Sequence, residues 1–171
     1  MAGIFLPEWH AFNLIISLMI SMKATFAAGC FWHVEDLFRK VKGVSSATSG
    51  YTGGAMPNPS YQDVCTDRTG HAEAVQVEYD PKQVSYDELL KVFWENHNPT
   101  TLNRQGPDVG TQYRSAIFFH DAEQEKAAKE SMKNLQESMP EKKVVTEITP
   151  AKEFFKAEEY HQRYFEKQGL I

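Results

Sequence analysis

Residues 23–41 read KATFAAGCFWHVEDLFRKV, and this stretch decides how the fold is organised. Its first part, Lys23–Ala28, is typical of a short buried strand with small side chains. Apolar residues then recur at helical spacing, at Phe31, Val34, Leu37, Phe38 and Val41. We therefore expect Cys30 at a strand-to-helix turn, where Gly29 supplies the tight backbone and Gly43 ends the helix.

The rest of the chain alternates strands and helices. Strand patterns occur at residues 44–51, 71–79, 114–119 and 144–148. Helices begin after the N-capping residues Ser85 and Asp121, and a segment rich in aromatic residues opens at Thr149-Pro150. Two long polar loops span Gly50–Gly70 and Asn96–Gln112. The order β-α-β-β-α-β-α-β-α, with 44–79 forming an antiparallel pair, predicts an α+β, two-layer α/β sandwich with a mixed, ferredoxin-like central sheet.

The composition is that of one acidic globular domain. The chain has 171 residues, a net charge of −5 and a pI of about 5.7. This length supports a single domain, which we place at residues 23–171 behind an extension over 1–22. The charge excludes nucleic-acid binding through a basic surface. Two cysteines are too few for a four-thiolate zinc site or a disulfide scaffold. We expect a monomer without metal, nucleic-acid or membrane partners.

The N-terminal extension contains an apolar run, Ala11–Met22 (AFNLIISLMISM). The run is too short for a membrane-spanning helix, which needs ~20 residues. Residues 27–30 (AAGC) resemble a lipoprotein cleavage box. A signal peptide begins with a positively charged segment, but the residues before this run include Glu8 and contain no Lys or Arg. Lys23 also separates the apolar run from the cleavage box. We interpret residues 1–22 as an amphipathic helix packing on the domain rather than a cleaved signal, and expect a cytoplasmic location.

Two residues carry nucleophilic or acid–base chemistry. A thiol becomes a nucleophile only when it is ionised, and a helix N-terminus lowers its pKa, so Cys30 is the candidate nucleophile. In the strand 71–79, the parity of Val75 and Val77 places Glu73 on the core face. A carboxyl among apolar neighbours has a raised pKa and donates a proton. The alternative is a carboxylate at the strand end that reaches solvent.

The residues around this pair suggest a substrate pocket. Trp32 falls off the apolar stripe of its helix and is expected to line a pocket, whereas Phe31 also fits simple core packing. Tyr61, Asp108 and Tyr113 lie in the polar loops, where phenolic hydroxyls can donate to a substrate oxygen. These groups together suit attack on a sulfoxide sulfur. The oxygen leaves only when it is protonated or hydrogen-bonded, and the S-methyl group needs an apolar slot.

Several ordered motifs between about Lys23 and Tyr164 resemble those of the A-type peptide-methionine sulfoxide reductases. They are Gly29-Cys30-Phe31-Trp32 with Glu35, Gly50-Tyr51-Thr52-Gly53-Gly54, Asn58-Pro59-Ser60-Tyr61, Val64-Cys65, Thr69-Gly70-His71-Ala72-Glu73, Asn98-Pro99-Thr100, Gly110-Thr111-Gln112-Tyr113-Arg114-Ser115, and Ala157-Glu158 with Tyr160-His161-Gln162. The resemblance covers nearly the whole domain, and its fold is similar to the sandwich predicted above.

The resemblance implies roles for some of these motif residues. Cys30 would attack the sulfur of a methionine S-sulfoxide and become a sulfenic acid, and Glu73 would be the general acid. Substrate binding would fall to Phe31, Trp32, Tyr61, Asp108 and Tyr113. Substrates would be oxidised proteins, peptides or free methionine sulfoxide, which makes the activity a repair of oxidised proteins. No cofactor is implied, only an external thiol reductant such as thioredoxin or a dithiol.

Three features depart from the family pattern. His33 stands where many relatives have Gly, and we expect an exposed polar side chain there. The C-terminus, KQGLI over 167–171, lacks the cysteines that in many relatives resolve the sulfenic acid. The extension over 1–22 is also outside the pattern. Cys65 is the one intramolecular candidate for a resolving thiol; otherwise an external thiol must attack the sulfenic acid directly.

Other classes of function remain open at this point. A cysteine hydrolase or acyl transferase would pair Cys30 with His71 or His97 and would need a contact between histidine and sulfur. A lipoprotein would be cleaved before Cys30 and acylated on its thiol, which would consume the nucleophile. A module that binds methionine sulfoxide without turnover is a further alternative.

Overall fold

The computed structural model describes residues 21–171. The helix expected within residues 1–22 lies outside the described residues, apart from the last two positions. Met22 is already the first residue of strand β1 (Met22–Ala28). Among the described residues, no helix is long and apolar enough to cross a membrane.

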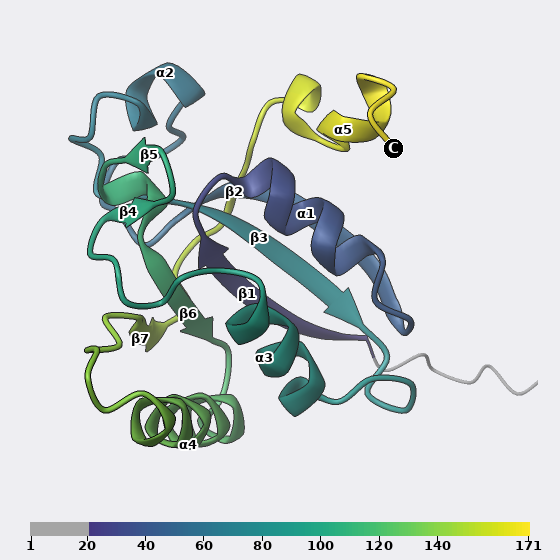
Figure 1. The fold of residues 1–171 in the computed structure, drawn as a ribbon. Coiled ribbons are helices and arrows are strands. Elements are labelled where there is room, and N and C mark those ends of the chain that lie inside the picture. Colours follow the sequence, from purple (N-terminus) through teal and green to yellow (C-terminus); the bar gives the residue numbers. More distant parts are fainter. Residues whose placement is uncertain (1–20) are drawn as a thin grey trace, which may run out of the picture.

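A six-stranded sheet forms the centre of the molecule, in the order β7-β6-β1-β3-β2-β8 (Figure 1). Besides β1, its strands are β2 (Val44–Thr52), β3 (Ala72–Tyr79), β6 (Ser115–Phe119), β7 (Glu147–Pro150) and β8 (Phe155–Lys156). The pair β6–β7 is parallel, and the other pairs are antiparallel. The inner order β6-β1-β3-β2 is the ferredoxin-like split β-α-β arrangement, so the predicted mixed sheet is confirmed.

Helices α1 (Phe31–Arg39) and α3 (Tyr86–Glu95) cover one face of this sheet, and α4 (Ala122–Ser138) packs beside α3 (Figure 1). The shorter elements are helices α2 (Tyr61–Val64) and α5 (Tyr164–Lys167), the 3₁₀ turns η1 (Thr111–Tyr113) and η2 (Glu159–His161), and the small hairpin β4 (Arg104–Gln105) with β5 (Asp108–Val109). Helices on a sheet give the two-layer α+β sandwich that the sequence predicts.

Stacked aromatic rings join β1 to the two covering helices. The ring of Phe26 on β1 stacks on Phe38 of α1 at 4.9 Å and on Phe93 of α3 at 5.3 Å between ring centroids. All three side chains are fully buried. The rings therefore hold α1 in place on the sheet, and with it the turn that carries Cys30.

Three element boundaries differ from the prediction. Helix α1 ends at Arg39 because the N–H of Val41 bonds to the carbonyl of Phe38, which tightens the last turn. Strand β7 begins at Glu147, not at residue 144, because the Val145 N–H donates to the Pro99 carbonyl instead of to the sheet. Inside the predicted loop 50–70, Ser60 and Asp63 form a capping box that starts α2.

The aromatic contact on α1 is open to a direct test. Truncating Phe38 to Ala leaves a cavity beneath α1 and should lower the free energy of unfolding by about 3–5 kcal/mol. Denaturant unfolding measures the change. Leu170→Ala, at a side chain that is 66% exposed, is the matched control and should change stability little. Equal losses in the two variants would contradict the assignment of Phe38 to the core.

Candidate active site

Cys30 caps the N-terminus of α1, directly after β1 and Gly29. Gly29 has φ +91°, and a Cβ there would lie 2.6 Å from the side chain of Gln105, so both backbone and space favour glycine. The Cys30 thiol is free and half-buried. The predicted strand-to-helix turn is therefore present, with the sulfur at the end of the helix.

The resting thiol is nevertheless not acidic. Burial, with the negative charge of Glu73, raises the pKa of Cys30 to about 11, although the backbone N–H groups of Trp32 and His33 lower it. The expectation that the helix N-terminus gives Cys30 a lowered pKa is therefore wrong for the free protein. The N–H groups favour the thiolate, but lost hydration and a facing carboxylate outweigh them.

Glu73 lies on the core face of β3, opposite Tyr51 of β2, and is 2% exposed. Its Oε2 accepts a hydrogen bond of 3.1 Å from the backbone N–H of Phe31, the first residue of α1. Burial, with the negative charge of Asp108, raises the pKa of Glu73 to about 7, against the lowering effect of that N–H. The alternation of side chains along β3 thus placed Glu73 correctly. With a pKa of about 7, the Glu73 carboxyl is protonated in a substantial fraction of the molecules at neutral pH.

The loop residues expected at the site surround this pair. Tyr61 begins α2, Asp108 lies in β5 and Tyr113 ends η1. Burial and then the charge of Glu73 raise the pKa of Tyr113, so its hydroxyl stays protonated. Asp108 raises the pKa of both Cys30 and Glu73. In Figure 1, α2 and the β4–β5 hairpin gather at the end of the sheet where β1 leads into α1.

Cys65 lies just outside this group, as the last, capping residue of α2, and its thiol is free and exposed. Burial and then a hydrogen bond with the Cys65 sulfur raise the pKa of Tyr61. The charge of Glu73 also contributes to the raised pKa of Tyr61, so both Cys65 and Glu73 act on this hydroxyl.

The two aromatic residues after Cys30 have different environments. Phe31 is 1% exposed, and its ring packs against Tyr51 at 5.7 Å. Trp32, which was expected to line a pocket, is half-buried. Its indole stacks on Tyr164 at 3.7 Å with an angle of 5° between the rings. The wall of the site is therefore built from α1 together with the C-terminal segment.

The histidines required by a cysteine hydrolase are engaged elsewhere. His71 Nδ1 accepts from the Gly54 N–H, and its Nε2 pairs with the Met56 carbonyl at 2.8 Å. His97 bonds to the carbonyl of Phe93 and the hydroxyl of Ser115, both at 2.7 Å. Neither imidazole bonds to Cys30 within residues 21–171, so the structure gives no support to a Cys–His nucleophile.

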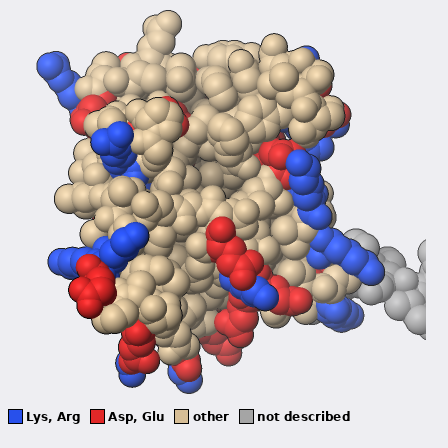
Figure 2. Space-filling model, in the orientation of Figure 1, with Lys and Arg blue, Asp and Glu red and all other residues tan. Residues whose placement is uncertain are grey.

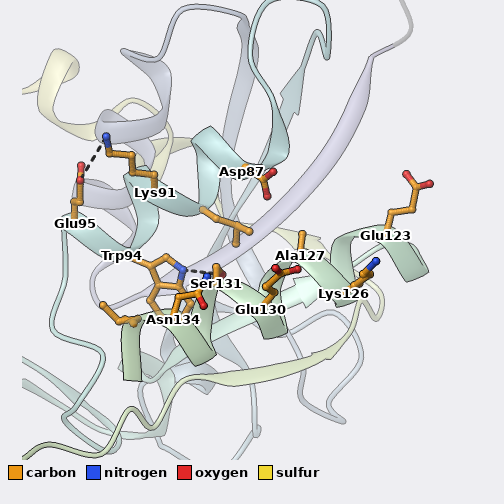
Figure 3. Close-up of a pocket in the computed structure, with 12 residues that line it drawn as sticks. Asp87, Lys91, Trp94, Glu95, Glu123, Lys126, Ala127, Glu130, Ser131 and Asn134 are labelled. Atoms are coloured by element: carbon orange, nitrogen blue, oxygen red, sulfur yellow. Dashed lines mark hydrogen bonds and ion pairs between the residues drawn. The ribbon is translucent and has the colours of Figure 1, made fainter. Parts of the chain in front are cut away.

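A cavity of about 790 Å³ opens between α3 and α4 but is not this site (Figure 3). The indole of Trp94 bridges the two helices there, with a 3.0 Å hydrogen bond to the Ser131 hydroxyl. The residues that line this cavity include none of those predicted for the site. Charged side chains gather over these helices, whereas the surface over the start of α1 carries few (Figure 2).

Tyr51, Glu158 and His161 lie near the site, although residue types alone did not mark them as functional. The Tyr51 hydroxyl donates to Glu158 Oε2 at 2.9 Å, and the Trp32 indole N–H donates to His161 Nδ1 at 3.0 Å. Glu158 and His161 could have been found from the sequence, because they belong to the motif at residues 157–162 that resembles the family. The resemblance did not assign a role to either residue.

Fold and site together define a cysteine-dependent enzyme in which a half-buried thiol lies near a protonatable carboxyl at the end of a ferredoxin-like sheet. Comparison with known proteins specifies the family. The family model described as peptide methionine sulfoxide reductase matches residues 22–170. The chain therefore belongs to the peptide methionine sulfoxide reductase family and is a thiol-dependent enzyme of that activity.

Individual relatives support this assignment. The chain is 62% identical over 146 residues to peptide methionine sulfoxide reductase MsrA of Methanothermobacter thermautotrophicus, covering 85% of this chain and 86% of that protein. It is 57% identical over 148 residues to MsrA of Geobacter sulfurreducens, covering 86% and 91%. These similarities do not support the hydrolase or lipoprotein alternatives.

Solved structures agree with the fold. Methionine sulfoxide reductase A of Corynebacterium diphtheriae superposes with a TM-score of 0.81 at 38% identity, covering 88% of this chain and 76% of that one. Reduced Mxr1 of Saccharomyces cerevisiae superposes with a TM-score of 0.82 at 38% identity, covering 88% and 87%. The same yeast protein in complex with Trx2 gives 0.60 at 29% identity, covering 84% of each chain.

The raised pKa of Glu73 predicts a pH-dependent stability. A carboxyl whose pKa rises from 4.5 to about 7 on folding stabilises the fold fully below pH 4.5. That contribution is lost as pH rises through 7. Glu73→Gln mimics the protonated form and lacks this dependence. From pH 4.5 to 8, the wild-type free energy of unfolding should therefore fall by roughly 3 kcal/mol relative to that of the variant. Denaturant titrations across this range measure the difference, and parallel curves would contradict it.

Proposed function

We propose that Cys30 reduces the S epimer of methionine sulfoxide, free or in oxidised proteins, with Glu73 as the proton donor. The observation that carries this assignment is the hydrogen bond of 3.1 Å that places the Glu73 carboxyl at the first N–H of α1, beside Cys30. A sulfoxide oxygen needs an acid, and a pKa of about 7 suits Glu73 to that task at neutral pH.

The proposed reaction moves one oxygen and two electrons. The Cys30 sulfur attacks the sulfoxide sulfur while Glu73 delivers its proton to the sulfoxide oxygen. The sulfur–sulfur bond made in this attack and the sulfur–oxygen bond of the substrate then both break, and the protonated oxygen passes to the Cys30 sulfur as a hydroxyl. Methionine leaves with its sulfur reduced by two electrons, and Cys30 becomes a sulfenic acid oxidised by two electrons. The proton that Cys30 loses on ionisation returns through solvent to Glu73. Protonated Glu73 no longer opposes ionisation of Cys30, so the same proton that activates the substrate also favours the thiolate.

The hydroxyls and rings supply binding. Tyr61 and Tyr113 stay protonated because burial raises the pKa of each, and we assign both hydroxyls as donors to the sulfoxide oxygen. The Trp32 indole, supported by buried Phe31, gives the S-methyl group an apolar wall. Asp108 adds its negative charge to the effect of burial in raising the pKa of Glu73, and we assign it a role in orienting the site. An epimer with methyl and oxygen exchanged would place the oxygen against this wall.

Recycling requires thiols from outside the chain. An external thiol attacks the sulfenic acid of Cys30, releasing water and forming a mixed disulfide, and a second thiol then restores Cys30. A thioredoxin-like dithiol fits this step, since yeast Mxr1 has been solved with Trx2. We assign Cys65 a structural role beside Tyr61, with resolution by Cys65 as the alternative that thiol counting decides. The proposal treats residues 23–171 as one catalytic domain working in a reducing compartment such as the cytoplasm.

A single turnover without reductant tests the mechanism. Reduced enzyme mixed with excess methionine S-sulfoxide should release one methionine per chain and lose one of its two thiols. Cys30→Ser should release none, and Cys65→Ser should behave like the wild type. Loss of both thiols would make Cys65 the resolving residue, whereas full activity of Cys30→Ser would contradict the nucleophile.

We expect the effects of substituting Tyr61 and Tyr113 on kcat/KM to be non-additive. Tyr61→Phe and Tyr113→Phe should each lower kcat/KM by less than about tenfold, because the other hydroxyl still reaches the oxygen. The double variant should lose about a hundredfold or more, because no hydroxyl donor then remains for the oxygen. Steady-state rates with a dithiol reductant give the comparison. A double variant near the wild-type rate would remove both residues from the mechanism.

A further inference from the structure

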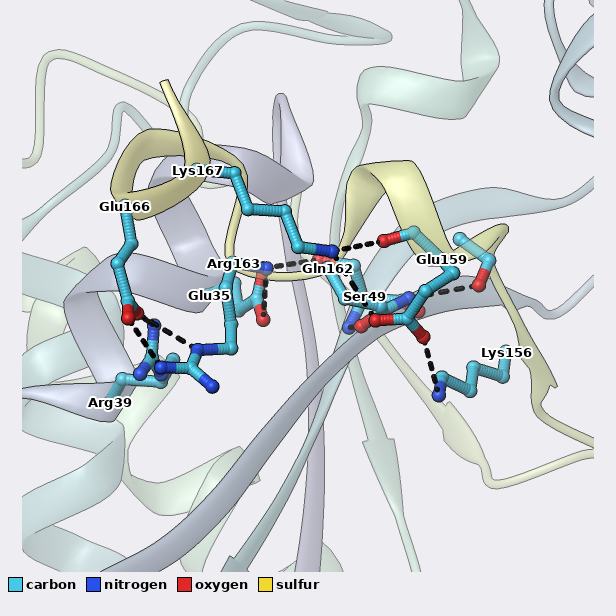
Figure 4. Close-up of polar contacts among 10 residues, drawn as sticks. Glu35, Arg39, Ser49, Lys156, Glu159, Gln162, Arg163, Glu166 and Lys167 are labelled. Atoms are coloured by element: carbon cyan, nitrogen blue, oxygen red, sulfur yellow. Dashed lines mark hydrogen bonds and ion pairs between the residues drawn. The ribbon is translucent and has the colours of Figure 1, made fainter. Parts of the chain in front are cut away.

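The proposed site has one wall whose geometry is set from a distant part of the chain. Residues 157–164 run past the start of α1 and carry both Glu158 and His161. They are fixed by buried polar contacts around Glu35, Ser49 and Gln162 (Figure 4). The Arg163 N–H donates to both oxygens of Glu35, at 3.0 and 2.9 Å.

The amide of Gln162 completes this attachment. Its Nε2 donates to the carbonyls of Ser49 and Ala157, both at 2.9 Å, and its Oε1 accepts from the Ser49 N–H at 3.0 Å. Gln162 is 6% exposed and Glu35 1% exposed. A buried side chain with these contacts leaves His161, the preceding residue, little freedom to move.

His161 lies at the centre of the aromatic wall. It is 1% exposed, and its ring centroid is 4.5 Å from that of Tyr61 and 5.1 Å from that of Phe31. Its Nδ1 accepts the indole N–H of Trp32 at 3.0 Å. An imidazole accepts a hydrogen bond at Nδ1 only when that nitrogen is unprotonated, so its proton lies on Nε2.

Glu158 faces the other side of the same ring. Its Oε2 is 4.0 Å from His161 Nε2, and that nitrogen has no hydrogen-bond partner within the described chain. Its Oε1 accepts the backbone N–H of Tyr61 at 2.8 Å. The carboxylate favours the Nε2–H tautomer and at the same time fixes the start of α2.

We propose that His161, oriented by Glu158, is a positioning residue that holds the Trp32 indole as the methyl-binding wall and sets its angle to Tyr61. This inference rests on the proposed function, in which Trp32 binds substrate. Burial lowers the pKa of His161, which keeps the ring neutral and able to accept at Nδ1. The stack on Tyr164 covers one face of the indole, and the hydrogen bond to His161 fixes how the indole is turned within that stack.

Two substitutions at His161 separate positioning from packing. In His161→Asn, the amide oxygen takes the place of Nδ1 and can still accept the indole N–H, whereas His161→Leu fills the space without an acceptor. We expect His161→Leu to raise KM for methionine sulfoxide about tenfold, the effect of one lost buried hydrogen bond, with kcat nearly unchanged. His161→Asn should stay close to the wild type. In a Trp32→Phe background, His161→Leu should add little.

The control is His120→Leu, at a histidine that bonds to the Thr25 hydroxyl at 2.8 Å and has no part in the proposed site. Its KM should match the wild type. Thermal unfolding of every variant identifies losses that come from instability. Equal KM increases in the Asn and Leu variants, or no increase in the Leu variant, would overturn the positioning role.

A second readout does not require turnover. Hydrogen exchange of the Trp32 indole N–H, assigned by its absence in Trp32→Phe, should be slow in the wild type and His161→Asn and fast in His161→Leu. Unchanged exchange in His161→Leu would overturn the contact itself. This measurement remains decisive even if the chain failed to reduce any sulfoxide, so failure of the proposed function and failure of this inference are distinguishable.

Discussion

The hydrogen bond from the Phe31 N–H to the buried carboxyl of Glu73 joins the two elements on which the site depends. The first N–H groups of a helix have no partner within the helix, so a carboxyl beneath them satisfies one that would otherwise be buried unpaired. The contact fixes the start of α1 on β3 and leaves Cys30, one residue earlier, facing Glu73. The position of the Glu73 carboxyl relative to Cys30 is thus set by one hydrogen bond between the helix backbone and a buried side chain.

The local parts of this arrangement were predictable from the sequence. Glycine, cysteine and an apolar stripe at helical spacing are short-range signals, and they placed Cys30 correctly at a strand-to-helix turn. Alternation along β3 placed Glu73 on the core face by the same kind of argument. The ferredoxin-like order of strands followed from the order of elements, because a split β-α-β unit can be completed in few ways.

Features of the site that depend on contacts between distant parts of the chain could not be predicted from the sequence. The pKa of Cys30 moves upward because burial and the Glu73 charge act together, and neither can be read from the residues next to Cys30. Helix α2 is different, because the signal that starts it is local: a capping box without an apolar stripe, inside a segment predicted as a polar loop. The contact of His161 with Trp32 joins the C-terminal segment to α1, and it exists only once Gln162 and Glu35 have fixed that segment.

The protonated state of the Cys30 thiol in the free protein affects its reactivity toward oxidants. The thiolate is the form of a cysteine that peroxides and electrophiles attack, and burial with the charge of Glu73 raises the pKa of Cys30 to about 11, so the thiol form predominates at neutral pH. The burial and the Glu73 charge that raise the pKa of Cys30 therefore also lower the reactivity of its thiol toward oxidants in the free protein, and protonation of Glu73 removes the second of these effects.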